Sequence, residues 1–333
     1  MNVVFNKTIK ILLNWFIGPL LLIWLSWSLY NQVKNQSDLH RSIQLILHAP
    51  FGAQGYKFWL VIFLVFVNWG LEAGKWQLLM QTIQPMRFFT AFKSVLCGVT
   101  LSLNTPNRIG EYGGRILFVN DGNRLKAVSL SITGSISQLI ITLLMGTGGL
   151  IFILNQSPEN TVTLPLLHSF WIKSLLYLNL CGSALLLLFY FRLGWIVRLI
   201  EKIPNAGKAV NYIAVLENFG ANILLRLLSI SAIRYIVFVL QYVLMMQVFD
   251  VEVGGWQSFW ILTVLFWVLA IVPSFAIAEI GVRGKFGVAL LGIFSSNITG
   301  ILAVTFGIWF FNLFIPAVTG GFLILSKKYF KEK

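Results

Sequence analysis

Charged residues are scarce in this chain of 333 residues: Asp, Glu, Lys and Arg together make up 11% of it, against about 25% in typical soluble domains. Apolar residues make up 57%, aromatic residues 15%, and the mean hydropathy is +0.81. So few charges cannot cover a water-facing surface, which excludes a soluble globular domain, a disordered protein and a coiled coil. The composition predicts an all-α integral membrane protein, because helices satisfy their own backbone groups in lipid.

Cysteine and histidine are also rare, with two and three residues. Cys97 and Cys181 lie in apolar runs, so we expect small buried side chains rather than a disulfide framework or a zinc site. The histidines form no HExxH pattern. We therefore expect no metal and no cofactor.

Acidic residues are outnumbered by basic ones, 11 against 25, which gives a net charge of +14. The basic residues lie in short loops and at the ends of apolar runs. This placement indicates topology signals and contact with anionic lipid head groups. We expect no nucleic-acid partner, because no contiguous basic domain exists to bind one.

Six apolar runs are long enough to cross a bilayer, which takes about 20 residues. The first is too long for the core of a signal peptide, so we expect it to remain as a span. An amphipathic piece, LHRSIQLILH from Leu39, is expected to lie at the interface. We predict a single polytopic membrane domain over residues 1–333, with spans at about 11–30, 58–80, 127–154, 168–191, 226–249 and 299–325.

Two further apolar regions, about 88–120 and 257–296, are interrupted by Pro, Gly and charged residues. The basic loops between spans belong inside by the positive-inside rule. The first region must then enter and return on the cytoplasmic side, and the second on the outer side. We predict two oppositely oriented re-entrant hairpins with a weak inverted repeat, in the plasma (inner) membrane with both termini cytoplasmic. The 31–57 loop, with three basic residues, fits this orientation poorly.

Both interrupted regions carry a Pro, then a Glu, then an Arg four residues after the Glu. A Glu–Arg pair at this spacing can close on one helical face. Each hairpin could thus bring a self-neutralised ion pair to membrane depth, where charges are costly and usually have a partner or a role. Two such pairs in opposed hairpins favour a transport-type site over purely structural pairing. The residues are Pro106, Glu111 and Arg115 in the first region, and Pro273, Glu279 and Arg283 in the second.

The first region has further features of an anion site. Thr105 before Pro106 is typical of a helix start, whose free N–H groups favour an anion. Arg108 in that first turn could contact a phosphate in bidentate fashion. Three glycines would allow close approach of backbone or lipid: Gly110, Gly113 and Gly114.

Other polar residues within the spans are less specific. Glu72 and Lys75, three residues apart, are expected to pair with each other, and Arg234 has no obvious partner. Ser131, Ser135 and Gln138 form a stripe at helical spacing, a pattern that packs helices more often than it binds a ligand.

The sequence resembles the transmembrane region of lysylphosphatidylglycerol synthases, often called the flippase-like family. The resemblance rests on an N-x-P-x-R-x-G-E-x-x-x-R run and on the second Pro-to-Glu segment, where Ala276 and Ala278 depart from a Gly-rich form. It implies a lipid with an anionic or phosphate-bearing head group. The chain ends shortly after its last span, so we expect no aminoacyl-transferase activity. The matching residues of the run are Asn104, Pro106, Arg108, Gly110, Glu111 and Arg115.

These observations together predict a lipid translocator. Arg108, Arg115 and Arg283 would hold the head group, and Glu111 and Glu279 would orient the arginines. Without a GxxxxGK[ST] loop, movement would be downhill or ion-coupled. Two alternatives remain open: an enzyme acting on a lipid-linked phosphate, and a scaffold for a partner membrane enzyme. The sequence leaves the oligomeric state undetermined.

Overall fold

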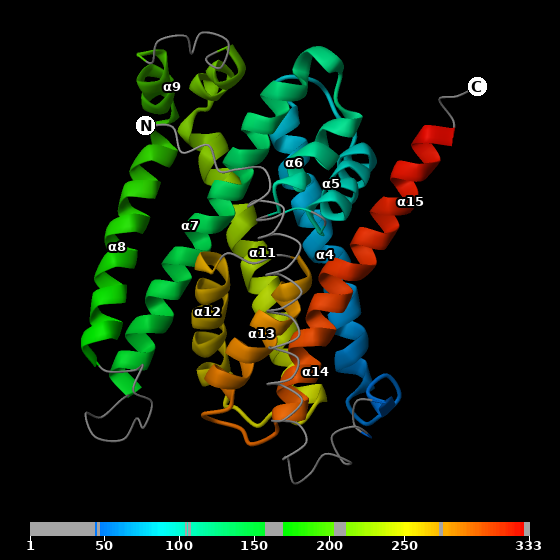
Figure 1. The fold of residues 1–333 in the computed structure, drawn as a ribbon, viewed down its shortest axis with the longest axis vertical. Coiled ribbons are helices and arrows are strands. Elements are labelled where there is room, and N and C mark those ends of the chain that lie inside the picture. The colour runs from blue at the N-terminus through cyan, green and yellow to red at the C-terminus, as the bar shows by residue number, and fades with distance from the viewer. Residues whose placement is uncertain are drawn as a thin grey trace, which may run out of the picture.

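The computed structural model describes residues 44, 47–103, 105, 108–156, 169–202, 211–272 and 276–329. Within these ranges the chain forms helices and no strand (Figure 1). The α-helices are α4 (Gly55–Met80), α5 (Phe88–Leu103), α6 (Gly110–Arg115), α7 (Arg124–Gln156), α8 (Ser169–Phe191), α9 (Leu193–Glu201), α11 (Ala221–Val248), α12 (Gly255–Ile271), α13 (Ala276–Leu291), α14 (Ile298–Trp309) and α15 (Ile315–Tyr329). The shorter helical turns are η3 (Ile116–Phe118), η4 (Asp121–Asn123), η6 (Ala214–Asn218) and η7 (Phe310–Phe314).

Five helical segments of the described chain are long and apolar enough to span a membrane. They correspond to five of the six predicted spans, which confirms an all-α membrane protein. The predicted span at 11–30 lies outside the described residues, as does the LHRSIQLILH piece apart from Gln44, Leu47 and His48. The five segments are Gly55–Met80, Asp121–Asn155, Phe170–Phe191, Ala221–Val248 and Ile298–Ser326.

Two shorter apolar helices, α5 and α12, extend only part of the way along the bundle before the chain turns back, as predicted for the interrupted regions (Figure 1). Helix α5 enters from the end of the bundle where α4 finishes and α7 begins, and the chain returns to that end through α6 and η3 (Figure 1). Helices α12 and α13 enter from and return to the opposite end. The fold therefore contains two oppositely oriented hairpins, hairpin 1 (α5, α6 and η3) and hairpin 2 (α12 and α13).

Glycines bring the hairpin backbones into direct contact with their neighbours. A Cβ added at Gly114 of α6 would lie 2.3 Å from the Cys97 carbonyl oxygen and 2.5 Å from the Gly98 Cα of α5. A Cβ added at Gly320 of α15 would lie 2.1 Å from the Leu96 carbonyl oxygen, on another face of α5. Helix α5 thus packs closely against both α6 and α15, because glycines on those two helices let the backbones approach. Small residues are the usual means of close helix packing in membranes.

The last span is divided by a π-helical turn. Helix α14 packs against α13 of hairpin 2, η7 follows, and α15 packs against α5 of hairpin 1. π-Helical turns within α-helices are frequent at functional sites. This turn therefore separates the half of the span that supports one hairpin from the half that supports the other.

The two cysteines differ in environment. Cys97 is buried in α5, as predicted, whereas Cys181 on α8 is exposed. The expectation for Cys181 was wrong because α8 lies at the edge of the bundle, mainly against α7, and turns most of its surface outward (Figure 1).

Candidate functional site

A cavity of about 550 Å³ lies where the two hairpins approach each other. Hairpin 1 contributes Arg108, and hairpin 2 contributes Phe266, residues 269–272 and Arg283. The long helices complete the wall with aromatic and aliphatic side chains and a few polar ones. The polar residues from the long helices are Asn68, Gln138, Thr142, Arg234, Tyr235 and Asn312.

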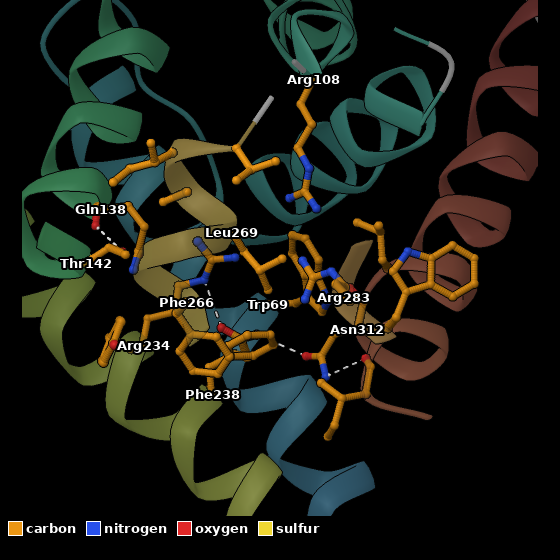
Figure 2. Close-up of a pocket in the computed structure, with 18 residues that line it drawn as sticks. Trp69, Arg108, Gln138, Thr142, Arg234, Phe238, Phe266, Leu269, Arg283 and Asn312 are labelled. Atoms are coloured by element: carbon orange, nitrogen blue, oxygen red, sulfur yellow. Dashed lines mark hydrogen bonds between the residues drawn. The ribbon is translucent and has the colours of Figure 1, made fainter. Parts of the chain in front are cut away.

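Three arginines line this cavity from three different elements. Arg108 lies in the turn before α6, Arg234 on α11 and Arg283 on α13. Figure 2 shows their side chains reaching toward the same space, with Arg108 extending down from hairpin 1. This concentration of guanidinium groups suits an anion with several acceptor oxygens, because each group can donate two parallel hydrogen bonds.

Arg108 has an unusual backbone conformation. Its φ angle is 57°, in the left-handed region that residues other than glycine seldom adopt. The turn is closed on one side by Thr105, whose hydroxyl oxygen accepts a hydrogen bond from the Gly110 N–H at 2.7 Å. Residues held in such conformations cluster at binding and catalytic sites. The prediction that a helix starts at Thr105 and Pro106, with Arg108 in its first turn, was wrong: helix α6 begins at Gly110, and Arg108 lies before it with a left-handed φ angle.

Behind the cavity wall, Glu72 of α4 holds three cations. Its Oε1 lies 2.6 Å from Arg115 Nη2, and its Oε2 lies 2.6 Å from Arg234 Nη1 and 2.9 Å from Lys75 Nζ. Glu111 also forms an ion pair with Arg115. Three positive and two negative side chains thus form one cluster, hereafter the Glu72 cluster. Such pairing is what makes charges tolerable away from water.

Arg234 joins the Glu72 cluster to the cavity. Its Nε donates to Asn68 Oδ1 at 2.8 Å, and Asn68 Nδ2 donates in turn to Asn312 Oδ1 at 3.1 Å. Asn312 lies in η7, where its main-chain carbonyl accepts a hydrogen bond from Trp69 Nε1 at 3.1 Å. The expectation that Arg234 lacks a partner was wrong, because its partners lie on α4, far away in sequence.

The residues predicted for the site separate into two groups. Arg108 and Arg283 line the cavity, whereas Glu111 and Arg115 belong to the Glu72 cluster, and Arg115 is only 2% exposed. The Glu111–Arg115 pair forms as predicted, but it is not self-contained, because Arg115 shares Glu72. Gly110 packs against α5, where an added Cβ would lie 2.2 Å from the Leu101 carbonyl oxygen.

The remaining predicted residues lie outside the described part of the chain. They are Asn104, Pro106, Pro273 and the side chain of Glu279, whose backbone belongs to α13. The pairing of Glu279 with Arg283 therefore stays a prediction.

Sequence reasoning missed the long-range members of the site. Glu72 and Lys75 do pair, but Glu72 also holds two arginines, and Asn68 and Asn312 form a buried amide pair. Gln138, assigned to a packing stripe, lines the cavity. The sequence did contain one signal for these residues. A carboxylate such as Glu72 and an amide such as Asn68 are energetically costly within an apolar span unless they have polar partners. The partners were not identifiable, because local spacing carries no information on contacts between distant helices.

Comparison with known proteins agrees with this architecture. No curated protein matches the chain. The family model described as the lysylphosphatidylglycerol synthase TM region matches residues 11–320, nearly the whole chain. The chain therefore belongs to the family of lysylphosphatidylglycerol synthase transmembrane regions.

Proposed function

We propose that the protein is a lipid translocator whose cavity binds the anionic or phosphate-bearing head group of a membrane lipid. The observation that carries the proposal is the convergence of Arg108, Arg234 and Arg283 on one cavity between two opposed hairpins. The basic end of the bundle, where the 81–87 connection and α9 lie (Figure 1), would be cytoplasmic in a plasma (inner) membrane.

The chemistry of the cavity supports binding of a phosphorylated head group. Guanidinium groups bind phosphate oxygens in bidentate fashion and are more weakly hydrated than ammonium groups, so they suit a partly dry site. Trp69, Phe238 and Phe266 supply apolar surface beside the arginines, where the glycerol backbone and upper acyl chains can pack. Arg115 would act indirectly, by fixing Glu72, which in turn positions Arg234.

The opposed hairpins support translocation rather than static binding. In several transporter folds, interrupted helices of opposite orientation meet at a central substrate site. Here the cavity is bounded by both hairpins and by the π-helical turn of the last span. A head group bound there would lie between the two ends of the bundle. We propose that the protein moves its lipid without modifying it.

The proposal is tested by flipping of a fluorescent phospholipid in vesicles containing the purified protein. We expect the Arg108→Gln, Arg283→Gln double variant to lose at least about tenfold in rate, equivalent to about 1.4 kcal/mol. The matched control is Arg124→Gln, which removes an exposed arginine paired with Asp121. Mass spectrometry of retained lipids should show one enriched phospholipid in the wild type that the double variant loses.

Three results would overturn the proposal. Equal flipping by the wild type and the double variant would mean that the arginines are structural. Release of phosphate from a lipid-linked substrate would replace the translocator with an enzyme. Selective lipid binding without flipping would favour a scaffold for a partner membrane enzyme.

A further inference from the structure

A second cavity, of about 430 Å³, lies in a groove between α4 and α11. Its wall contains Gln77 from the end of α4, Gln81 directly after that helix, and Arg226 from the beginning of α11. None of the residues in its wall lines the cavity between the hairpins. We refer to it as the α4–α11 groove.

The polarity of the groove changes along its length. Helix α4 ends and α11 begins at the basic end of the bundle, so Gln77, Gln81 and Arg226 lie toward that end. Ile230 and Ile233 of α11 follow about 6 and 10 Å deeper than Arg226, at 1.5 Å per residue. A phospholipid in the adjoining leaflet has the same sequence of parts, a polar head near the surface and apolar chains below it.

Arg226 is a cation available for a ligand. It is exposed, lies about 7.5 Å along the helix from Ala221, and makes no hydrogen bond or ion pair with any part of the chain that the structure describes. A cation inside the end of a span usually has an anionic partner or reaches the head-group region. The anionic surface of a bilayer attracts basic residues at this level.

A glycine keeps the groove open. Gly74 of α4 lies in its wall, and a Cβ added there would meet no atom within 4 Å. Gln77 is held in place by its Nε2, which donates to the Met86 carbonyl at 3.0 Å. The wall of the groove thus combines open space beside Gly74 with a Gln77 side chain that is held by a hydrogen bond.

We propose that the α4–α11 groove binds one phospholipid of the leaflet at the basic end, with its phosphate on Arg226 and an acyl chain against Ile230 and Ile233. This site is separate from the cavity between the hairpins. It stands whether or not the protein translocates lipid, because none of its wall residues belongs to the proposed translocation site.

The test uses native mass spectrometry of the purified chain in detergent, titrated with dioleoyl phosphatidic acid or with dioleoylglycerol, which lacks the phosphate. All variants are made in the Arg108→Gln, Arg283→Gln background, which removes two of the three arginines of the cavity between the hairpins, so that any remaining binding there is the same in every variant. Arg226→Gln removes the charge, and Gly74→Leu fills the groove. Arg198→Gln, an exposed arginine on α9, and Gly182→Leu, an equally open glycine on α8, are the controls.

We expect each groove variant to weaken binding of one phosphatidic acid molecule at least tenfold and each control to leave it unchanged. Dioleoylglycerol should bind equally weakly to the background protein and to Arg226→Gln. Unchanged phosphatidic acid binding in Arg226→Gln or Gly74→Leu would overturn the proposal. So would displacement of phosphatidic acid by inorganic phosphate, because the site would then bind an anion rather than a lipid.

Discussion

Glu72 pairs with three buried or partly buried cations, of which the local sequence pattern predicted only Lys75. Its two carboxylate oxygens contact Lys75, Arg115 and Arg234, which come from α4, α6 and α11. The side chains of Glu72, Lys75 and Arg115 are each less than 5% exposed. One residue therefore ties hairpin 1 and α11 to α4.

Removing this carboxylate should be strongly destabilising. Glu72→Gln would leave three cations without their shared partner, and breaking a buried ion pair from one side costs about 3 to 5 kcal/mol. Lys75→Met should cost less, because Glu72 would keep both arginines. The free energy of unfolding in mixed detergent micelles checks this order. Asp121→Asn, which removes an exposed pair with Arg124, is the control and should have little effect.

The residue scale also shows where sequence reasoning reaches its limit. The Glu111–Arg115 and Glu72–Lys75 pairs follow from spacings of four and three on a helix, and both form. The contact between Glu72 and Arg234 joins residues 162 positions apart. Sequence periodicity does not specify which two helices face each other. The sequence therefore indicated that a charge at Arg234 is costly within a span, but it did not identify Glu72 as the partner of Arg234.

At the scale of elements, hairpin 1 depends on a backbone contact that only glycine permits. Gly114→Ala should destabilise the protein by about 1 to 3 kcal/mol, because its Cβ would overlap the backbone of α5. Gly113→Ala is the matched change one residue away, where the nearest atom is Leu101 Cδ1 at 3.8 Å. This variant should be neutral or slightly stabilising, since alanine favours a helix over glycine.

Thermal unfolding of the two variants beside the wild type measures this difference. Equal stability of Gly113→Ala and Gly114→Ala would contradict the close packing of α6 on α5. The same experiment at Gly320 and Gly321 of α15 extends the comparison to the other face of α5.

At the scale of the whole molecule, the hairpins and the long helices define two ends of the bundle. Starting from a Cys181→Ser protein, single cysteines at Thr82 and Gly122 should react with a membrane-impermeant thiol reagent from one side only. Cysteines at Glu252 and Ser296 should react from the other side only. By the positive-inside rule the first pair should be cytoplasmic. Labelling of Gly122 and Ser296 from the same side would refute the opposed hairpins.

The general arrangement could be predicted from the sequence because it depends on local and one-dimensional signals. The lengths of the apolar runs predicted all five helical segments of the described chain that can span a membrane. The interruptions by Pro, Gly and charged residues predicted both hairpins. The cavity could not be predicted, because its wall combines residues from Asn68 to Leu313. Its composition depends on how the helices pack in three dimensions.

The π-helical turn η7 has a consequence for the geometry of the last span. Each extra residue in a helix rotates everything after it by about 100°, since an α-helix has 3.6 residues per turn. Helices α14 and α15 are thus two out-of-phase halves of one rod, each aimed at a different hairpin. This change of phase occurs within Phe310–Phe314, and Asn312 and Leu313 of that turn line the cavity, so the site lies where the last span changes the face that it presents to the two hairpins.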